Sequence, residues 1–284
     1  MTGDAYTEKG ELQAIPGPSA LGGGTRRFWQ LVWLLGTTDF KLTYFGTALG
    51  YVWSLIRPLA LFGVLLVVFT QVFNFGDAVK DYAAVLLLNV MLFTFFAETT
   101  QLAVTSVVNK EGVVRKMQFP RLAIPVSNVL TGLFNLGLNL IAVFTFILIY
   151  GVDPLWTWAL FPLCIIALAI ITAAVATLLS VLYVKARDTA IIWSVVSLML
   201  FYATPVLYPI EQVPESFRFI ILSNPLAAIL EQAREWVIDP TAPGALEAVG
   251  SVPKLLVPIG VAVGVCALSA WLFVRNAPRI AEEL

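Results

Sequence analysis

The sequence contains no histidine and only two cysteines among its 284 residues. The lack of histidine removes the commonest zinc ligand and the side chain most often used as a general base at neutral pH. Cys164 and Cys266 both lie inside long apolar runs, where a free cysteine behaves as a small buried hydrophobic residue. We therefore expect no metal centre, no disulfide framework and no histidine-based catalysis.

Charge is also scarce, because only 12% of the residues are Asp, Glu, Lys or Arg and the net charge is −1. Soluble domains carry about 25% charged residues and about 45–50% apolar residues, whereas 59% of this chain is hydrophobic. A protein that binds nucleic acid usually has a basic surface. The composition therefore argues against a nucleic-acid partner and indicates a membrane protein.

Six long apolar runs divide the chain into a regular pattern. They cover residues 59–75, 83–108, 122–150, 155–184, 190–208 and 255–274. A helix needs roughly 20 apolar residues to cross a hydrocarbon core of about 30 Å. Because lipid offers no hydrogen-bond partner to the backbone, such segments must be helical. We predict an all-α integral membrane protein with six transmembrane helices.

Lysine and arginine are distributed unevenly between the two sides that six spans create. With the N-terminus inside, 13 of these residues lie on the cytoplasmic side and four lie outside. The four outer residues are Lys80, Arg218, Arg234 and Lys254. Cytoplasmic loops carry the excess of positive charge, so both termini are expected in the cytoplasm. The predicted organisation is a flexible tail at 1–26, a transmembrane domain at 27–279 and a short cytoplasmic end at 280–284.

The segment from Arg27 to Pro58 precedes the first run and is rich in aromatic residues. It includes Trp29, Trp33, Asp39, Lys41 and Tyr44. Aromatic side chains favour the boundary between membrane and water, which predicts an interfacial helix. The alternative is a seventh span, which the charges of Asp39 and Lys41 disfavour.

The segment from Pro209 to Pro253, directly after Tyr208, is expected outside. Pro214 can open one short helix, and Asn224-Pro225 supplies an N-cap followed by proline at the first position of a second helix. Glu231 is expected to point away from the apolar face of that second helix. Both helices are too short to span, so we predict a re-entrant hairpin in the outer leaflet. A pair of helices lying flat on the surface is the alternative.

The sequence has no phosphate-binding loop of the form G-x-x-x-x-G-K-[ST]. Any ATP-driven transport would therefore need the ATPase of another subunit. The loop from Asn109 to Arg121 combines basic and apolar residues, which suits a short amphipathic helix that docks into a partner. A solvated positive loop is the alternative. The candidate coupling residues are Lys110, Val113, Val114, Arg115, Met117, Phe119, Pro120 and Arg121.

Residues 39–44, 49–53, 57–58, 109–125, 185–188, 204–209 and 224–226 together resemble the permease subunits of ABC-2 type polysaccharide exporters. The resemblance implies a homodimer that binds two ABC ATPase subunits, with ATP and magnesium on those subunits and no cofactor on this chain. It further implies an interfacial gate helix before the first span, a coupling helix after the second span and an outer hairpin. The implied substrate is a polyprenyl-linked glycan, exported across a bacterial plasma membrane.

A sugar chain needs a wide route, and aromatic side chains suit its walls. The candidate pathway residues are Phe93, Phe96, Phe201, Tyr202 and, as the only ionisable residue inside a predicted span, Glu98. Lipid contact or core packing is the alternative for each aromatic residue, and a structural hydrogen bond is the alternative for Glu98. Two other functions stay open: export of a drug or small amphiphile, and an integral membrane enzyme acting on lipid-linked sugars.

Overall fold

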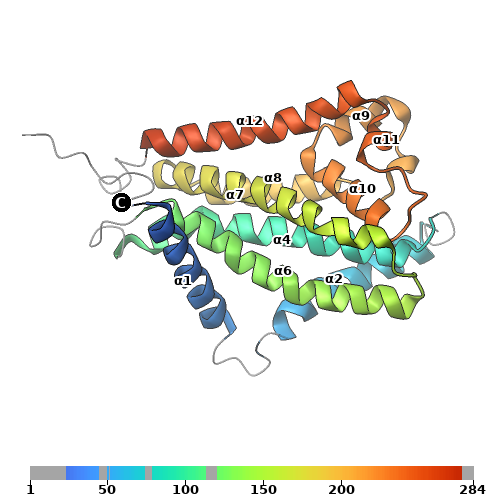
Figure 1. Ribbon diagram of the computed structural model, residues 1–284, viewed down its shortest axis with the longest axis horizontal. Coiled ribbons are helices and arrows are strands. Elements are labelled where there is room, and N and C mark those ends of the chain that lie inside the picture. Colours follow the sequence, from blue (N-terminus) through green and yellow to red (C-terminus); the bar gives the residue numbers. More distant parts are fainter. Residues whose placement is uncertain (1–23, 45–49, 51, 74–78, 113–119, 277–284) are drawn as a thin grey trace, which may run out of the picture.

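A computed structural model describes residues 24–44, 50, 52–73, 79–112 and 120–276, and all regular elements in these ranges are helices (Figure 1). The longer helices are α1 (Thr25–Tyr44), α2 (Val52–Gln71), α4 (Tyr82–Asn109), α6 (Ala123–Tyr150), α7 (Phe161–Lys185), α8 (Thr189–Ala203) and α12 (Val252–Asn276). The shorter ones are η1 (Trp156–Leu160), η2 (Ile210–Gln212), α9 (Glu215–Leu222), α10 (Pro225–Val237) and α11 (Ala245–Val249).

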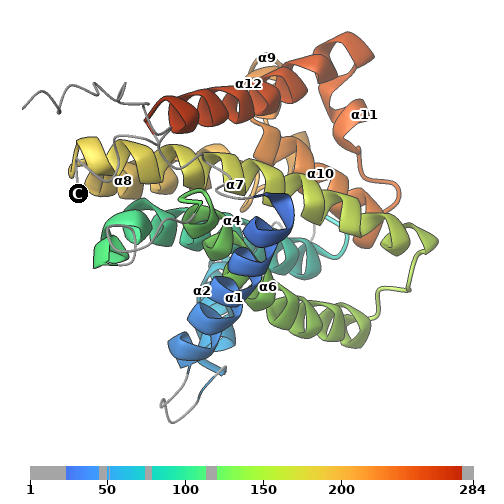
Figure 2. The same cartoon turned by 60° about the vertical axis from the view of Figure 1, so that its left-hand side comes forward.

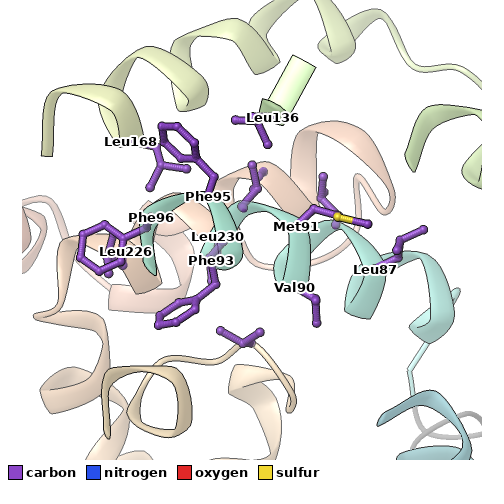
Figure 3. Close-up of a cluster of buried hydrophobic side chains, with 14 of the residues drawn as sticks. Leu87, Val90, Met91, Phe93, Phe95, Phe96, Leu136, Leu168, Leu226 and Leu230 are labelled. Atoms are coloured by element: carbon purple, nitrogen blue, oxygen red, sulfur yellow. The ribbon is translucent and has the colours of Figure 1, made fainter. Parts of the chain in front are cut away.

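Helix α4 lies at the centre of the molecule, in contact with α2, α6, α7, α8 and α10. Leu86, Leu87 and Leu88 on this helix are fully buried. A helix that is apolar on every side is stable only when other helices or lipid cover it, and here neighbouring helices cover it. Figure 3 shows the cluster around α4, with Leu136 of α6, Leu168 of α7, and Leu226 and Leu230 of α10.

Five helices in the described residues are long and apolar enough to cross a membrane. They are α2, α4, α6, η1 with α7, and α12. The fifth predicted run, 190–208, forms a helix only to Ala203, because Pro205 removes a backbone donor and disfavours helical geometry at Thr204. Helix α8 is therefore a shorter apolar helix of 15 residues, and the sixth span stays a prediction.

The first span begins earlier than the sequence pattern predicted. Helix α2 starts at Val52 rather than Leu59, and Pro58 lies inside it. Membrane helices tolerate such a proline when neighbouring groups satisfy the freed carbonyl. The predicted interfacial segment 27–58 is therefore two elements, and Arg57 belongs to the first apolar helix instead of a cytoplasmic loop.

Helix α1 runs obliquely across one end of the bundle (Figures 1 and 2). Its inner face packs against α6, where Phe28 and Val32 contact Ala123 and the Thr131 hydroxyl donates to the Gly36 carbonyl at 3.0 Å. Its outer face carries apolar side chains that the chain itself does not cover. This two-sided character suits the predicted interfacial helix.

Helices α9, α10 and α11 gather at the opposite end of the bundle (Figure 1). The start of α10 is packed between the long helices at that end of the bundle. The Asn89 amide donates to the Pro205 carbonyl at 3.2 Å, and the Asn224 amide donates to the Thr204 hydroxyl at 2.9 Å. Asn89 follows the start of α4 by seven residues, or roughly 10 Å of helix. Helix α10 is therefore packed among the long helices rather than laid over them.

Helices α4 and α6 approach each other closely at Gly132. A Cβ atom there would lie 2.2 Å from Thr99 Oγ1, 3.3 Å from Thr99 Cβ and 3.0 Å from Phe95 Cε2. Rotation of the threonine side chain alone does not clear that space. We therefore expect Gly132→Ala to destabilise the protein by about 1–3 kcal/mol through overpacking, measured by thermal unfolding of the purified chain.

Gly137→Ala on the same helix is the matched control. Its Cβ atom would meet nothing within 4 Å, and alanine is a better helix former than glycine. We expect no loss of stability from this variant. Equal destabilisation by the two substitutions would contradict the close approach at Gly132.

Candidate functional site

A cavity of about 980 Å³ opens between α1, α2, α4, α6 and α8. Its walls are formed by Thr43, Gly50, Trp53, Ser54, Arg57, Ala97, Glu98, Gln101, Leu102, Asn135, Asn139, Ser194 and Ser197. Most of these residues are polar, although four of the five helices are apolar. Polar side chains inside membrane helices face a protein interior or a water-filled route and mark functional sites. This cavity is therefore the candidate site.

An ion pair lies on the wall of the cavity. Arg57 Nη1 on α2 is 3.4 Å from Glu98 Oε1 on α4. The Arg57 side chain is 82% exposed and the Glu98 side chain is 48% exposed, so both groups face open space within this chain. Glu98 was predicted to be the only ionisable residue within a span. That prediction was wrong, because α2 begins before Arg57 and carries its partner.

Six of the polar wall residues form pairs with helical spacing. Asn135 and Asn139 are four apart on α6, Ser194 and Ser197 are three apart on α8, and Glu98 and Gln101 are three apart on α4. Residues three or four apart share one face of a helix. The sequence pattern did not single out these pairs except for Glu98, although polar residues at this spacing within apolar runs were a visible signal.

The aromatic residues predicted for the pathway do not line the cavity. Phe93 and Phe96 are buried, with Phe93 packed edge-on against Phe201 and Phe96 against Trp193. These contacts join α4 to α8. Tyr202 is 60% exposed on α8. A pathway role for these residues stays a prediction, and for Phe93 and Phe96 the geometry within this chain is that of core packing.

Asp39 and Lys110, predicted separately for the gate and the coupling segment, form an ion pair of 2.5 Å. The contact joins α1 to the residue that follows α4. Both side chains line a second cavity of about 380 Å³, together with Asn128. Thr43 and Leu102 line both cavities, so the second cavity extends the first toward this end of α4.

The remaining gate residues lie on α1. Trp29 and Trp33 are each 60% exposed, and Trp33 also packs edge-on against Phe134 of α6. Lys41 is exposed in the last turn. Tyr44 is the last residue of α1. The exposed tryptophans are four residues apart, so they share one face of α1.

Most of the predicted coupling segment lies outside the described residues, namely Val113, Val114, Arg115, Met117 and Phe119. Its flanks are described. Pro120 and Arg121 are buried, and α6 starts two residues after Arg121. On the other flank, Lys110 contacts Asp39. Because α1 also packs against the start of α6, both ends of the segment are joined to α1.

The segment predicted as the outer hairpin contains the predicted caps. Pro214 precedes α9, Pro225 opens α10, and the Asn224 side chain accepts a hydrogen bond from the Leu226 backbone at 3.0 Å. The predicted N-cap is therefore confirmed. The Tyr208 hydroxyl donates to the Tyr202 carbonyl at 3.2 Å, and burial raises the pKa of this hydroxyl.

The burial of Glu231 on α10 was not predicted. Its side chain is 2% exposed, with its carboxylate 3.5 Å from Arg234 Nη1. The Arg234 guanidinium is also 3.0 Å from Glu211. Burial raises the pKa of the Glu231 carboxyl to about 7, although the neighbouring guanidinium acts in the opposite direction. The helix is buried on both faces because it packs among α4 and α7.

Asn224→Ala removes both the cap of α10 and the hydrogen bond to Thr204. Loss of an N-cap costs roughly 1 kcal/mol, and loss of a further hydrogen bond costs about 1 kcal/mol. We expect a destabilisation of about 1–2 kcal/mol, measured by thermal unfolding. Asn224→Asp keeps an acceptor for the Leu226 backbone and for the Thr204 hydroxyl, so it should lose less. An Asp variant as unstable as the Ala variant would contradict the capping role.

Apolar spanning helices around a polar cavity define a multi-pass membrane protein of the transporter class. Residues 30–237 match the family described as ABC-2 type transporter. The chain therefore belongs to the ABC-2 type transporter family, whose members are membrane subunits rather than catalytic ones and work in general with an ABC ATPase. The match confirms the resemblance to ABC-2 exporter permeases that the sequence motifs indicated.

Three curated relatives share one name, O-antigen export system permease protein RfbA. One from Klebsiella pneumoniae is 28% identical over 215 residues, which cover 75% of this chain and 82% of the relative. A second from the same species is 28% identical over 209 residues, which cover 73% and 80%. One from Myxococcus xanthus is 27% identical over 194 residues, which cover 68% and 74%.

Proposed function

We propose that this chain is the permease subunit of an ATP-driven exporter that moves a lipid-linked polysaccharide out of the cytoplasm. The observation that carries the proposal is the polar cavity between α1, α2, α4, α6 and α8. A polyhydroxylated chain needs polar partners inside an otherwise apolar bundle, and this cavity offers amides, hydroxyls and an ion pair. The names of the relatives, which are O-antigen export permeases, support the same cargo class.

The transporter would consist of two copies of this chain and two ABC ATPase subunits. ATP and magnesium would bind on the ATPase subunits, since this sequence has no phosphate loop. Helices α2 and α12 expose apolar side chains such as Val64 and Val263, and such faces suit lipid or a second copy. Two copies meeting beside α2 and α8 would enclose the cavities between them.

Energy from ATP would reach the cavity through segment 109–121. The ends of this segment are joined to α1 by the ion pair of Asp39 with Lys110 and by the packing of Phe28 against Ala123. A displacement of the segment would therefore move α1, which borders the larger cavity at Thr43. This arrangement supports a gate role for α1 and a coupling role for segment 109–121.

The proposed location of the protein is a bacterial plasma membrane, with both termini and the coupling segment in the cytoplasm. The excess of lysine and arginine on that side supports this orientation. Helix α10 would then lie in the outer leaflet as part of a re-entrant hairpin. The hydrogen bond from Asn224, the N-cap of α10, to Thr204 supports that placement, because the adjacent Pro205 carbonyl accepts a hydrogen bond from Asn89 within α4.

The proposal is tested by co-expressing the chain with a candidate ABC ATPase subunit. We expect the two subunits to copurify with equal numbers of copies, measured by native mass spectrometry. We expect reconstituted vesicles to move a lipid-linked glycan across the membrane only when ATP is present. An ATPase whose phosphate-loop lysine is replaced is the control, because it assembles without hydrolysis. Transport that continues with this control would contradict ATP-driven export.

Export of a small amphiphile is the competing function within the same fold. The amides of Asn135 and Asn139 and the hydroxyls of Ser194 and Ser197 favour a hydroxylated cargo over an apolar one. The same vesicles loaded with a lipophilic dye would separate the two functions. If ATP drives movement of the dye but not of the glycan, the exported substrate is a small amphiphile and not a polysaccharide.

A further inference from the structure

One polar side chain in the wall of the larger cavity is buried without a complete set of hydrogen bonds. Asn139 on α6 is 7% exposed and lines the cavity. Its Oδ1 accepts no hydrogen bond from any residue in the described part of the chain. A buried acceptor without a donor costs about 1–3 kcal/mol. The Oδ1 atom is itself buried, so a donor that enters the cavity would reach it once the Asn139 amide turns toward the cavity that this residue lines.

Other side chains with amide and hydroxyl groups line the cavity near Asn139 in the fold. Asn135 lies one turn earlier on the same helix, and Ser194 and Ser197 approach from α8. Amide and hydroxyl groups both donate and accept, which matches the chemistry of sugar hydroxyls. Trp53 on α2 is 53% exposed at the same cavity, and an indole ring offers a flat surface to the apolar face of a pyranose.

The wall of the larger cavity carries one positive and one negative side chain, so its charges cancel. Arg57 and Glu98 are the charged residues in the lining, and they pair with each other at 3.4 Å. A charged ligand would therefore have to compete with this pair, whereas a neutral ligand would not. The volume of about 980 Å³ is at the upper end of pockets that hold a drug-sized molecule. The cavity is large enough for a short run of sugar units.

We propose that Asn139, together with Asn135, Ser194 and Ser197, forms a hydroxyl-binding subsite for neutral sugar units. The subsite rests on the proposed export of a polysaccharide and adds the kind of unit that is recognised. Asn139 follows the start of α6 by 16 residues, or roughly 24 Å of helix. Sugar units would therefore be bound deep within the bundle, beyond the ion pair, by hydrogen bonds rather than by charge.

Binding is tested on the purified chain in lipid nanodiscs with maltoheptaose as the neutral probe. The change in tryptophan fluorescence is measured, and a Trp53→Phe chain identifies the part that comes from the cavity. Fully O-methylated maltoheptaose, which has no hydroxyl donors, is the second probe. We expect maltoheptaose to bind the unmodified chain at least tenfold more tightly than the methylated probe. Equal binding of the two probes would overturn the subsite without any variant.

Asn139→Leu removes the acceptor at nearly constant side-chain size, and we expect it to weaken maltoheptaose binding at least tenfold. Asn276→Leu is the matched control, because it makes the same change at a buried residue, the last of α12, that lines neither cavity. It should bind as the unmodified chain does. Asn139→Thr retains an acceptor on a smaller side chain and should bind with intermediate affinity. Unchanged binding by Asn139→Leu would overturn the proposal.

The two proposals fail in different ways. If the complex with the ATPase exports no glycan while binding still depends on Asn139, the export function is wrong and the subsite stands. If the complex exports glycan while maltoheptaose binding does not depend on Asn139, the subsite is wrong and the export function stands.

Discussion

Replacement of residues 113–119 by glycine and serine is expected to abolish export, with the chain still present in the membrane at its normal level. This sequence contains no phosphate loop, so in the proposed exporter the energy of ATP would arrive through a contact with the ATPase subunit. Segment 109–121 is short, lies between α4 and α6, and is joined to α1 at both ends. Export in cells and ATP hydrolysis by the purified complex are measured together.

Single substitutions distinguish the contributions within the segment. Buried apolar anchors carry most of the energy of an interface, whereas ion pairs at its rim contribute little. We therefore expect Phe119→Ala to reduce export at least tenfold and Lys116→Ala to reduce it less than twofold. The Phe119→Ala complex should still hydrolyse ATP, uncoupled from transport. Normal export by the glycine and serine variant would contradict the coupling role.

Reversal of either charge in the Arg57–Glu98 pair is expected to reduce export about tenfold. Arg57→Glu places two carboxylates side by side, and Glu98→Arg places two guanidinium groups together, at a separation where like charges repel strongly outside bulk water. The double exchange, Arg57→Glu with Glu98→Arg, restores opposite charges and should regain a large part of export. Export is measured per amount of chain in the membrane, so that losses of assembly are separated from losses of transport.

Arg275→Glu is the control for a reversed charge alone. Arg275 lies in the last turn of α12, where its guanidinium is 5.3 Å from the centre of the Trp271 ring, away from the cavity. We expect this variant to export normally. If the double exchange is no better than the single variants at equal amounts of chain, the pairing of Arg57 with Glu98 is not what transport requires.

The ranges of the long helices were largely predictable because the signal is local. Long apolar runs must become helices in lipid, and the predicted run 122–150 differs from α6 by one residue at its start. The N-cap at Asn224 was predictable for the same reason, since a cap needs only its own side chain and the following backbone. The start of α2 was misjudged because Pro58 and Arg57 are typical of a boundary but lie inside the helix.

The candidate site was predictable only in part. Periodicity within a run tells which residues share a face, but it does not tell toward which neighbour that face is turned. A pathway role for Phe93 and Phe96 therefore stays a prediction, and within this chain both side chains pack into the core. Asn135 and Asn139 were passed over although their spacing places them on one face of α6.

The sequence by itself determined that the chain is a helical membrane protein, because the length of its apolar runs is a property of composition and local order. The tertiary structure decided which side chains meet. Arg57 and Glu98 are 41 residues apart, and Asp39 and Lys110 are 71 residues apart. Such contacts, and the cavity they border, depend on the rotation and tilt of packed helices, which no single segment encodes.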